Sequence, residues 1–220
     1  TLDLAASLGE VTRASGNIEI DAFGFFQVAG ALNLDKSSSS IKLGDLASTT
    51  TVNEATNAVA VDQLTLGGSG LTAFAGLNGG QTNAMGLGLS GVNFALAMFT
   101  EQSPAQGQTA REWTALQATA SGASFSGVDG LTISASDMSV AINRKAADNT
   151  LVDFDAQNLT VQTGTAGAPS SITLDLAASL GEVTRASGNI EIDAFGFFQV
   201  AGALALEKRE STVTLADDVN

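Results

Sequence analysis

Several residue types on which enzymes and metal sites depend are missing from this chain. It contains no cysteine, no histidine and no tyrosine, and only two prolines and one tryptophan in 220 residues. The absence of cysteine excludes disulfide bonds and thiolate metal sites. The absence of histidine removes the commonest general base and the commonest metal ligand. The sequence therefore favours a function without catalysis.

Motifs for catalysis and phosphate binding are absent as well. The sequence contains no phosphate-binding loop, no dinucleotide-binding fingerprint and no Ser–His–Asp arrangement. Its glycine-rich pieces, such as GGSG at 67–70, do not lead from a strand pattern into a helix pattern, as an anion-binding loop requires. We expect that the protein is not an enzyme, and we assign no catalytic, cofactor-binding or metal-ligating residues and no cofactor.

Basic residues are scarce in the sequence. Nine lysines and arginines stand against 23 aspartates and glutamates, which gives a formal net charge of −14. Binding to nucleic acid is disfavoured, because phosphate contacts need a basic surface. An anionic membrane surface is disfavoured for the same reason, and the charge keeps the chain soluble.

No stretch of the chain is long and apolar enough for a membrane-spanning helix. Residues 63–100 carry no charge, but polar residues and glycines interrupt them at short intervals. The densest apolar piece, VNFALAMF at 92–99, is only eight residues long, whereas a spanning helix needs about 20 mostly apolar residues. We expect no membrane span here, and we interpret this stretch as part of a sheet.

The chain carries one segment twice. The segment TLDLAASLGEVTRASGNIEIDAFGFFQVAGAL occupies positions 1–32 and returns without a substitution at 173–204. We therefore predict that 1–172 is one full repeat unit and that 173–220 is the start of the next tandem copy. In such arrays each unit packs mainly on its neighbours, so we expect no separate globular domains.

Alternation of apolar and polar residues dominates the sequence and predicts β-strands. Five segments share one template, in which alternating apolar positions shift phase once by one residue. A β-bulge at the shift would return the apolar side chains to the same face. The template copies begin at Leu64, Met85, Leu116, Leu131 and Val152, and the shifts fall at 69–70, 90–91, 121–122, 136–137 and 157–158.

The spacing of the copies favours an antiparallel meander. Their starts are unevenly spaced, and the interval from Leu116 to Leu131 hardly suffices for one coil of the alternative, a parallel β-solenoid. The copies that begin at 64 and 85 are followed by a second pair at 131 and 152 with the same spacing, which indicates a duplicated hairpin. We predict an all-β fold: an elongated antiparallel meander of long bulged strands, folded over on itself at the bulges as a superhelical repeat. The segments 43–58 and 100–112 are predicted to be surface connectors.

Paired carboxylates are the best candidates for chemistry. Members of each pair stand at alternate positions and so lie on one face of a predicted strand, where neighbouring strands could add ligands for calcium. The alternative is that they only keep the sheet surface soluble, and no spaced calcium motif occurs. The pairs are Glu19 with Asp21, Asp153 with Asp155, and Glu191 with Asp193.

Aromatic residues give two further candidates. Trp113 begins a predicted strand and is either a binding platform or, as we favour, a side chain that packs at the edge of the core. Phe26 keeps the apolar phase of its strand, whereas Phe23 and Phe25 point the other way. These two side chains indicate either a second buried contact or a partner surface.

Segments such as GLSGVNFALAMF (88–99) and VDFDAQNLTVQTG (152–164) resemble the repeats of giant bacterial adhesins, which are haemagglutinin-like surface proteins. This resemblance implies a cell-surface, extracellular location and a structural role as a spacer or in cell–cell adhesion. The expected partners are neighbouring repeats of the same chain and another cell surface. Two alternatives remain: a folded β-groove that carries lipid, and a calcium- or carbohydrate-binding adhesin domain.

Overall fold

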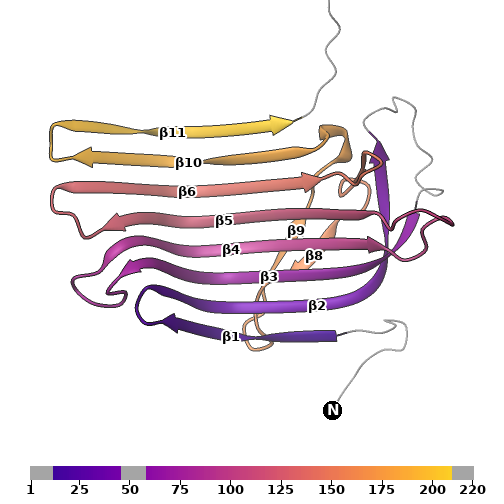
Figure 1. Ribbon diagram of the computed structural model, residues 1–220, viewed down its shortest axis with the longest axis horizontal. Coiled ribbons are helices and arrows are strands. Elements are labelled where there is room, and N and C mark those ends of the chain that lie inside the picture. The colour runs from indigo at the N-terminus through magenta and orange to yellow at the C-terminus, as the bar shows by residue number, and fades with distance from the viewer. Residues whose placement is uncertain (1–11, 46–57, 210–220) are drawn as a thin grey trace, which may run out of the picture.

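A computed structural model describes residues 12–45 and 58–209 of the chain. Its main feature is one antiparallel sheet of long strands, which lie side by side in Figure 1. The long strands are β1 (Thr12–Ala22), β2 (Phe26–Asp45), β3 (Ala58–Leu77), β4 (Met85–Glu101), β5 (Glu112–Ser126), β6 (Leu131–Arg144), β10 (Val183–Ala194) and β11 (Phe198–Arg209).

The strand order follows the chain, so the predicted meander is confirmed. The order is β1-β2-β3-β4-β5-β6-β10-β11, and all these pairs are antiparallel, which contradicts the solenoid alternative for the described residues. Turns of three or four residues join β1 to β2, β5 to β6 and β10 to β11, as antiparallel neighbours allow. Residues 127–130 form the β5–β6 turn and residues 78–84 the β3–β4 connection.

The two copies of the repeated segment form matching hairpins. In the first copy Thr12 pairs with Lys36 at one end and Ala22 with Phe26 at the other. In the second copy the equivalent residues pair in the same register, from Thr184 with Lys208 to Ala194 with Phe198. One hairpin forms one edge of the sheet and the other hairpin forms the opposite edge, so the sheet is open (Figure 1).

Bulges occur where the template shifts phase. The pairings of β3 with β2 and β4, and of β6 with β10, change register near these positions. Gly70, Gly91 and Asp137 have φ values of 60°, 59° and 49°, a region that glycine tolerates and aspartate tolerates better than most residues. Because the bulges compensate the phase shift, the alternating apolar positions of the template stay on one face of the sheet, as predicted.

A smaller second layer covers part of one face of the sheet. It is built from β7 (Thr150–Val152), β8 (Leu159–Gln162), β9 (Ser171–Leu174) and the short 3₁₀ helix η2 (Ala178–Leu180). β7 pairs with the end of β2, and β8 pairs with β9 behind the long strands (Figure 1). The buried core lies between this layer and the sheet, and it includes Phe99, Trp113, Phe154, Val161 and Leu174.

Two predictions about the architecture are wrong. The long strands form one open sheet that does not fold over on itself at the bulges, and the second layer packs on part of the face opposite to the alternating apolar side chains (Figure 1). The template copy at Val152 forms no long strand and no hairpin with β6, because the chain turns at 154–157. Phe154 is turned into the core there, so this copy leaves the sheet in order to cover it.

The two predicted connectors have different outcomes. Residues 102–111 form turns and irregular backbone between β4 and β5, as predicted. The 43–58 connector is described only at its ends, where 43–45 belong to β2 and Ala58 begins β3. The rest of that connector, the segment 1–11 of the first repeat copy and the segment 210–220 lie outside the described residues.

Candidate functional site

One face of the sheet is apolar across all eight long strands. Partners in an antiparallel register point to the same side, so the register gives the rows of side chains that cross the sheet. Three such rows contain only glycine and apolar residues, and we call them together the apolar face. They are Gly16-Leu32-Gly68-Phe94-Ala118-Val140-Ala186-Leu206, Ile20-Val28-Ala73-Leu89-Ala123-Ala135-Ile190-Gly202 and Ala22-Phe26-Ala75-Leu87-Phe125-Ile133-Ile192-Val200.

No described residue covers the apolar face. The second layer packs on the opposite face, where the buried residues of β4 and β5 lie. The large apolar side chains that are exposed within the strands all stand at positions that point to the apolar face. Leu206, for example, is 67% exposed. These side chains are Ile20, Phe26, Leu77, Met85, Leu87, Met98, Ile133, Phe198, Val200, Leu204 and Leu206.

The opposite face, which we call the covered face, has two unlike halves. Towards one end the second layer buries small and aromatic side chains, among them Ala95, Ala97 and Trp113. Beyond the bulges the same face is polar and carries Glu19, Asp21 and their counterparts in β10. The chain therefore places these carboxylates on the side away from the apolar face.

The carboxylate pairs do not assemble a calcium site among the residues that the structure describes. Glu19 and Asp21 lie in β1, Glu191 and Asp193 lie in β10, and five strands separate the two pairs. No group of three or more acidic side chains that could hold a metal ion occurs in the described ranges. The calcium-binding alternative has no support in this part of the chain.

Asp21 stabilises the turn between β1 and β2. Its carboxylate accepts hydrogen bonds from the Gly24 backbone N–H at 2.7 Å and from Gln27 Nε2 at 3.0 Å. These two hydrogen bonds lower the pKa of Asp21, because they favour the charged carboxylate. The counterpart Asp193 accepts the same two bonds in the second hairpin, both at 2.9 Å. The acidic residues at these positions thus have a structural role.

Asp153 and Asp155 do not share a strand, which corrects the sequence prediction. Asp153 follows β7, and its Oδ1 accepts the backbone N–H of Ala178 at 3.0 Å. Asp155 lies in the turn that follows. The strand pattern of this segment is interrupted because the chain turns at 154–157, and Asp153 connects η2 to the end of β7.

The aromatic residues of the hairpin turns are exposed. Phe23 is 96% exposed and Phe25 is 57% exposed, so neither makes the second buried contact within the described chain. Phe23 also has a φ of 55°, a conformation that a bulky side chain rarely adopts. The partner-surface alternative is the one that these exposures favour. In the second hairpin Phe195 and Phe197 are exposed as well.

Trp113 is a core residue, as the favoured interpretation predicted. Its side chain is 1% exposed, and its Nε1 donates to the backbone oxygen and the hydroxyl of Thr150, both at 3.2 Å. The guanidinium of Arg111 lies 5.2 Å from the centre of the indole ring, a cation–π geometry. Trp113 therefore ties β5 to β7 and carries an arginine on its outer side.

Arg111 joins two carboxylates at this edge of the core. It binds Glu101 through two hydrogen bonds of 2.7 and 2.9 Å and Asp148 through one of 3.0 Å. The hydrogen bonds from Arg111 lower the pKa of Glu101 and outweigh the effect of burial. Burial raises the pKa of Asp148, but hydrogen bonds from Thr150 and Arg111 outweigh it and give a net lowering.

We expect the Arg111→Met variant to lose part of the pH dependence of stability. Carboxylates with a lowered pKa stabilise the folded chain above their unfolded pKa values, near 4, and lose this contribution as the pH falls through their folded values. The variant should be less stable by about 1 kcal/mol at pH 7 and nearly equal to the native chain at pH 2. Thermal unfolding at pH 7, 5, 4, 3 and 2 measures this difference.

Arg185→Met is the matched control. Arg185 pairs with Glu207 at 2.8 Å, but both side chains are more than one third exposed, so their pair contributes little. A constant difference between Arg111→Met and the native chain at all these pH values would contradict the assigned role of Arg111.

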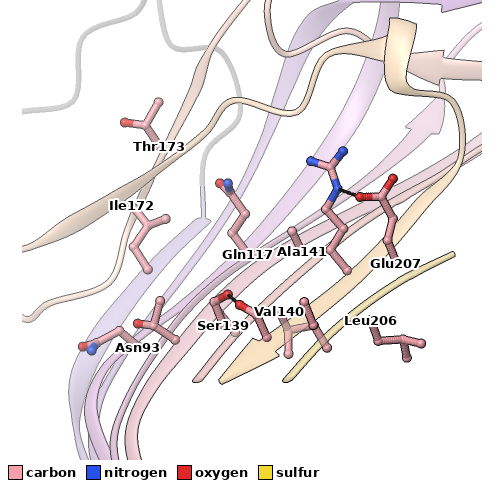
Figure 2. A pocket seen from close by; sticks show the side chains of 15 residues that line it. Asn93, Gln117, Ser139, Val140, Ala141, Ile172, Thr173, Leu206 and Glu207 are labelled. Carbon is pink, nitrogen blue, oxygen red and sulfur yellow. Dashed lines mark hydrogen bonds and ion pairs between the residues drawn. The ribbon is translucent and has the colours of Figure 1, made fainter. Parts of the chain in front are cut away.

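A groove of about 550 Å³ lies on the covered face beside β9. Figure 2 shows Ile172 and Thr173 on one side of it, with Gln117 and Glu207 on the other. Gln117 Nε2 donates a hydrogen bond to Asp175 Oδ1 at 2.7 Å. The hydroxyl groups of Ser139 in β6 and Ser187 in β10 form a hydrogen bond of 2.8 Å with each other. The groove is open and most of its polar side chains already have hydrogen-bond partners, so the apolar face is the stronger candidate for binding.

Sequence reasoning missed the second buried face. In VNFALAMF at 92–99 both phases of the alternation are apolar, which is typical of a strand that packs on both sides. The structure places Ala95, Ala97 and Phe99 in the core and Phe94, Leu96 and Met98 on the other side. This run was therefore the pattern that could have revealed a covering layer.

The segment 63–100 belongs to β3, β4 and their connection, as predicted. Among the described residues there is no helix with the length and apolar character needed to cross a membrane. Comparisons of the chain with family models, with curated proteins and with solved structures give no match.

Proposed function

We propose that the chain is a non-enzymatic structural repeat module, in which successive units equivalent to 1–172 extend one β-sheet. The observation that supports this proposal is the position of the two identical hairpins. They have the same register, and they occupy opposite edges of one open sheet. A sheet that ends in a copy of its own first hairpin can continue by the same steps.

The strand edges agree with such continuation. β10 pairs with β6, whereas its copy β1 has no strand on its outer edge among the described residues. β2 pairs with β3, whereas its copy β11 has no outer partner in the same part of the chain. Each hairpin therefore has a neighbouring strand on the side where its copy has none. A strand equivalent to β6 could pair with β1, and a strand equivalent to β3 could pair with β11, and the sheet would then continue in both directions.

The location and the adhesive role are the further parts of the proposal. An extracellular fibre of a bacterial surface protein, used as a spacer or in cell–cell contact, fits the resemblance of the sequence to giant adhesins. It also fits a chain with no cysteine and a net charge of −14. In this role the repeats supply reach, and neighbouring repeats are the main partners.

Small-angle scattering of a lengthened chain tests the proposal. In a chain in which 1–172 is duplicated, the added unit contributes six strands, β1 to β6, to the sheet. At about 4.8 Å per strand the width of the sheet, measured across the strands, should increase by roughly 29 Å as one continuous body.

The original chain, measured at the same concentrations, is the control for this comparison. A distance distribution with two separate maxima would show two bodies joined by a linker. That result would contradict the continuous sheet.

A further inference from the structure

We propose that the apolar face binds the apolar face of a second copy of the chain, so that two sheets form a β-sandwich. This inference goes beyond the proposed repeat role and does not depend on it, because it concerns the face of the sheet and not its edges. Three properties of the apolar face indicate that its partner is a second copy of the chain: its area, its lack of charge and the arrangement of its large and small side chains.

The area of the apolar face exceeds what a stable dimer needs. Eight strands at about 4.8 Å give a width of roughly 38 Å, and about eight residues at ~3.3 Å give a length of roughly 26 Å. The product is about 1,000 Å² per copy, whereas a stable protein interface buries about 800 Å² per partner. The largest apolar patch on a typical monomer covers about 300–600 Å². An uncovered face of this size therefore calls for a partner of the same extent.

The charges of the chain do not oppose this contact. The three rows of the apolar face contain no charged side chain, although the chain has a net charge of −14. Glu19, Asp21 and Asp35 stand at the alternate positions that point to the covered face. Glu191 and Asp193, the counterparts of Glu19 and Asp21 in β10, do the same. In a sandwich these carboxylates point outward into solvent, and the two sheets meet through uncharged surface.

Two neighbouring rows are complementary in size. In β5 and β6 the first of these rows carries Ala123 and Ala135, and the next row carries Phe125 and Ile133. A two-fold axis between these rows places the large side chains of one copy over the small ones of the other. Sheets that pack about 10 Å apart interdigitate in this way. The face is thus self-complementary at β5 and β6, as a two-fold interface centred there requires.

Sedimentation velocity of the native chain, with a matched pair of variants, tests the inference. The native chain should sediment with twice the mass of 22.1 kDa. Ile133→Asp should raise the dimer dissociation constant by about 100-fold or more, because a two-fold interface buries the new carboxylate twice. Thr132→Asp should leave the dissociation constant unchanged. Thr132 is next to Ile133 in β6, but its exposed side chain has the phase of the opposite face, in the polar half beyond the second layer.

A second variant guards against a folding defect. Leu87 is 48% exposed on the same face in β4, so Leu87→Asp should also dissociate the dimer while the circular dichroism of the sheet persists. A native chain that is monomeric at every concentration, or a dimer that both variants leave intact, would overturn the inference. So would a monomer that carries co-purified lipid in native mass spectrometry, because the lipid would then be the occupant of the face. The proposed repeat role can fail independently, because it is measured by the width gained per unit.

Discussion

Replacing Gly67 with alanine is expected to displace the β8–β9 hairpin from the sheet and to lower the free energy of unfolding by about 3 kcal/mol or more. A Cβ at this position would collide with the backbone oxygen of Gln162. It would also lie 2.8 Å from the carbonyl carbon of that residue and 2.9 Å from Thr163 Cα. These are backbone atoms, so no side-chain rotation relieves the collision. The hairpin must move, and the burial of Val161 and Leu174 is lost.

Hydrogen exchange and chemical denaturation together measure this effect. We expect the amides of β8 and β9 to lose protection in Gly67→Ala, while β3 to β6 keep theirs at neutral pH. Gly88→Ala is the matched control, because a Cβ there meets only Ser124 atoms, at 3.8 and 3.9 Å, on the same face beyond the second layer. If Gly67→Ala were as stable as Gly88→Ala, the close contact between β8 and β3 would be wrong.

The long strands and their bulges could be predicted because both depend on local pattern. Alternation gives the strand, and a one-residue change of phase gives the bulge, so a few consecutive residues contain the information. The shift at 136–137 is an example: Asp137 has a φ of 49°, at the position where the apolar phase changes. The meander followed from the short and variable spacing between template copies.

The second layer could not be predicted from local pattern, because distant contacts decide it. The segment after Val152 matches the strand template, yet it folds behind the sheet. Gln157 Nε2 donates to the backbone oxygen of Ser40, which is far away along the chain, and Asp153 accepts from Ala178. Such contacts leave no periodic trace in the sequence. Only the two-sided apolar run in β4 indicated that a layer would cover the sheet.

The sequence likewise identified the apolar side of each strand but not what covers it. Alternation shows that Leu32 and Val28 share a face, and the register extends that face across the sheet. The prediction that the sheet covers this face by folding over assumed that the partner lies within the same unit. Local pattern contains no information about a partner in a second chain, so the candidate surface needed the register and the exposure of the whole sheet.

Trp113→Ala is the second variant with a large expected effect, a loss of about 3–5 kcal/mol in the free energy of unfolding. Trp113 is the largest fully buried side chain of the described residues, and its removal leaves a cavity between β5 and β7. The substitution also removes the donor to Thr150 and the ring beneath Arg111. Denaturation should be followed by far-ultraviolet circular dichroism, because the chain has no other tryptophan.

Trp113→Phe separates the apolar contribution from the hydrogen bond. Phenylalanine fills most of the space and lacks the indole N–H, so we expect a loss of about 1–2 kcal/mol. An alanine variant within about 1 kcal/mol of the native chain would mean that the layer after β6 is not docked. Gly67 and Trp113 act on the same layer, so the loss in the double variant Gly67→Ala/Trp113→Ala should be smaller than the sum of the single losses. Fully additive losses would instead show that the β8–β9 hairpin and the Trp113 site unfold independently, and the second layer would then not be one cooperative unit.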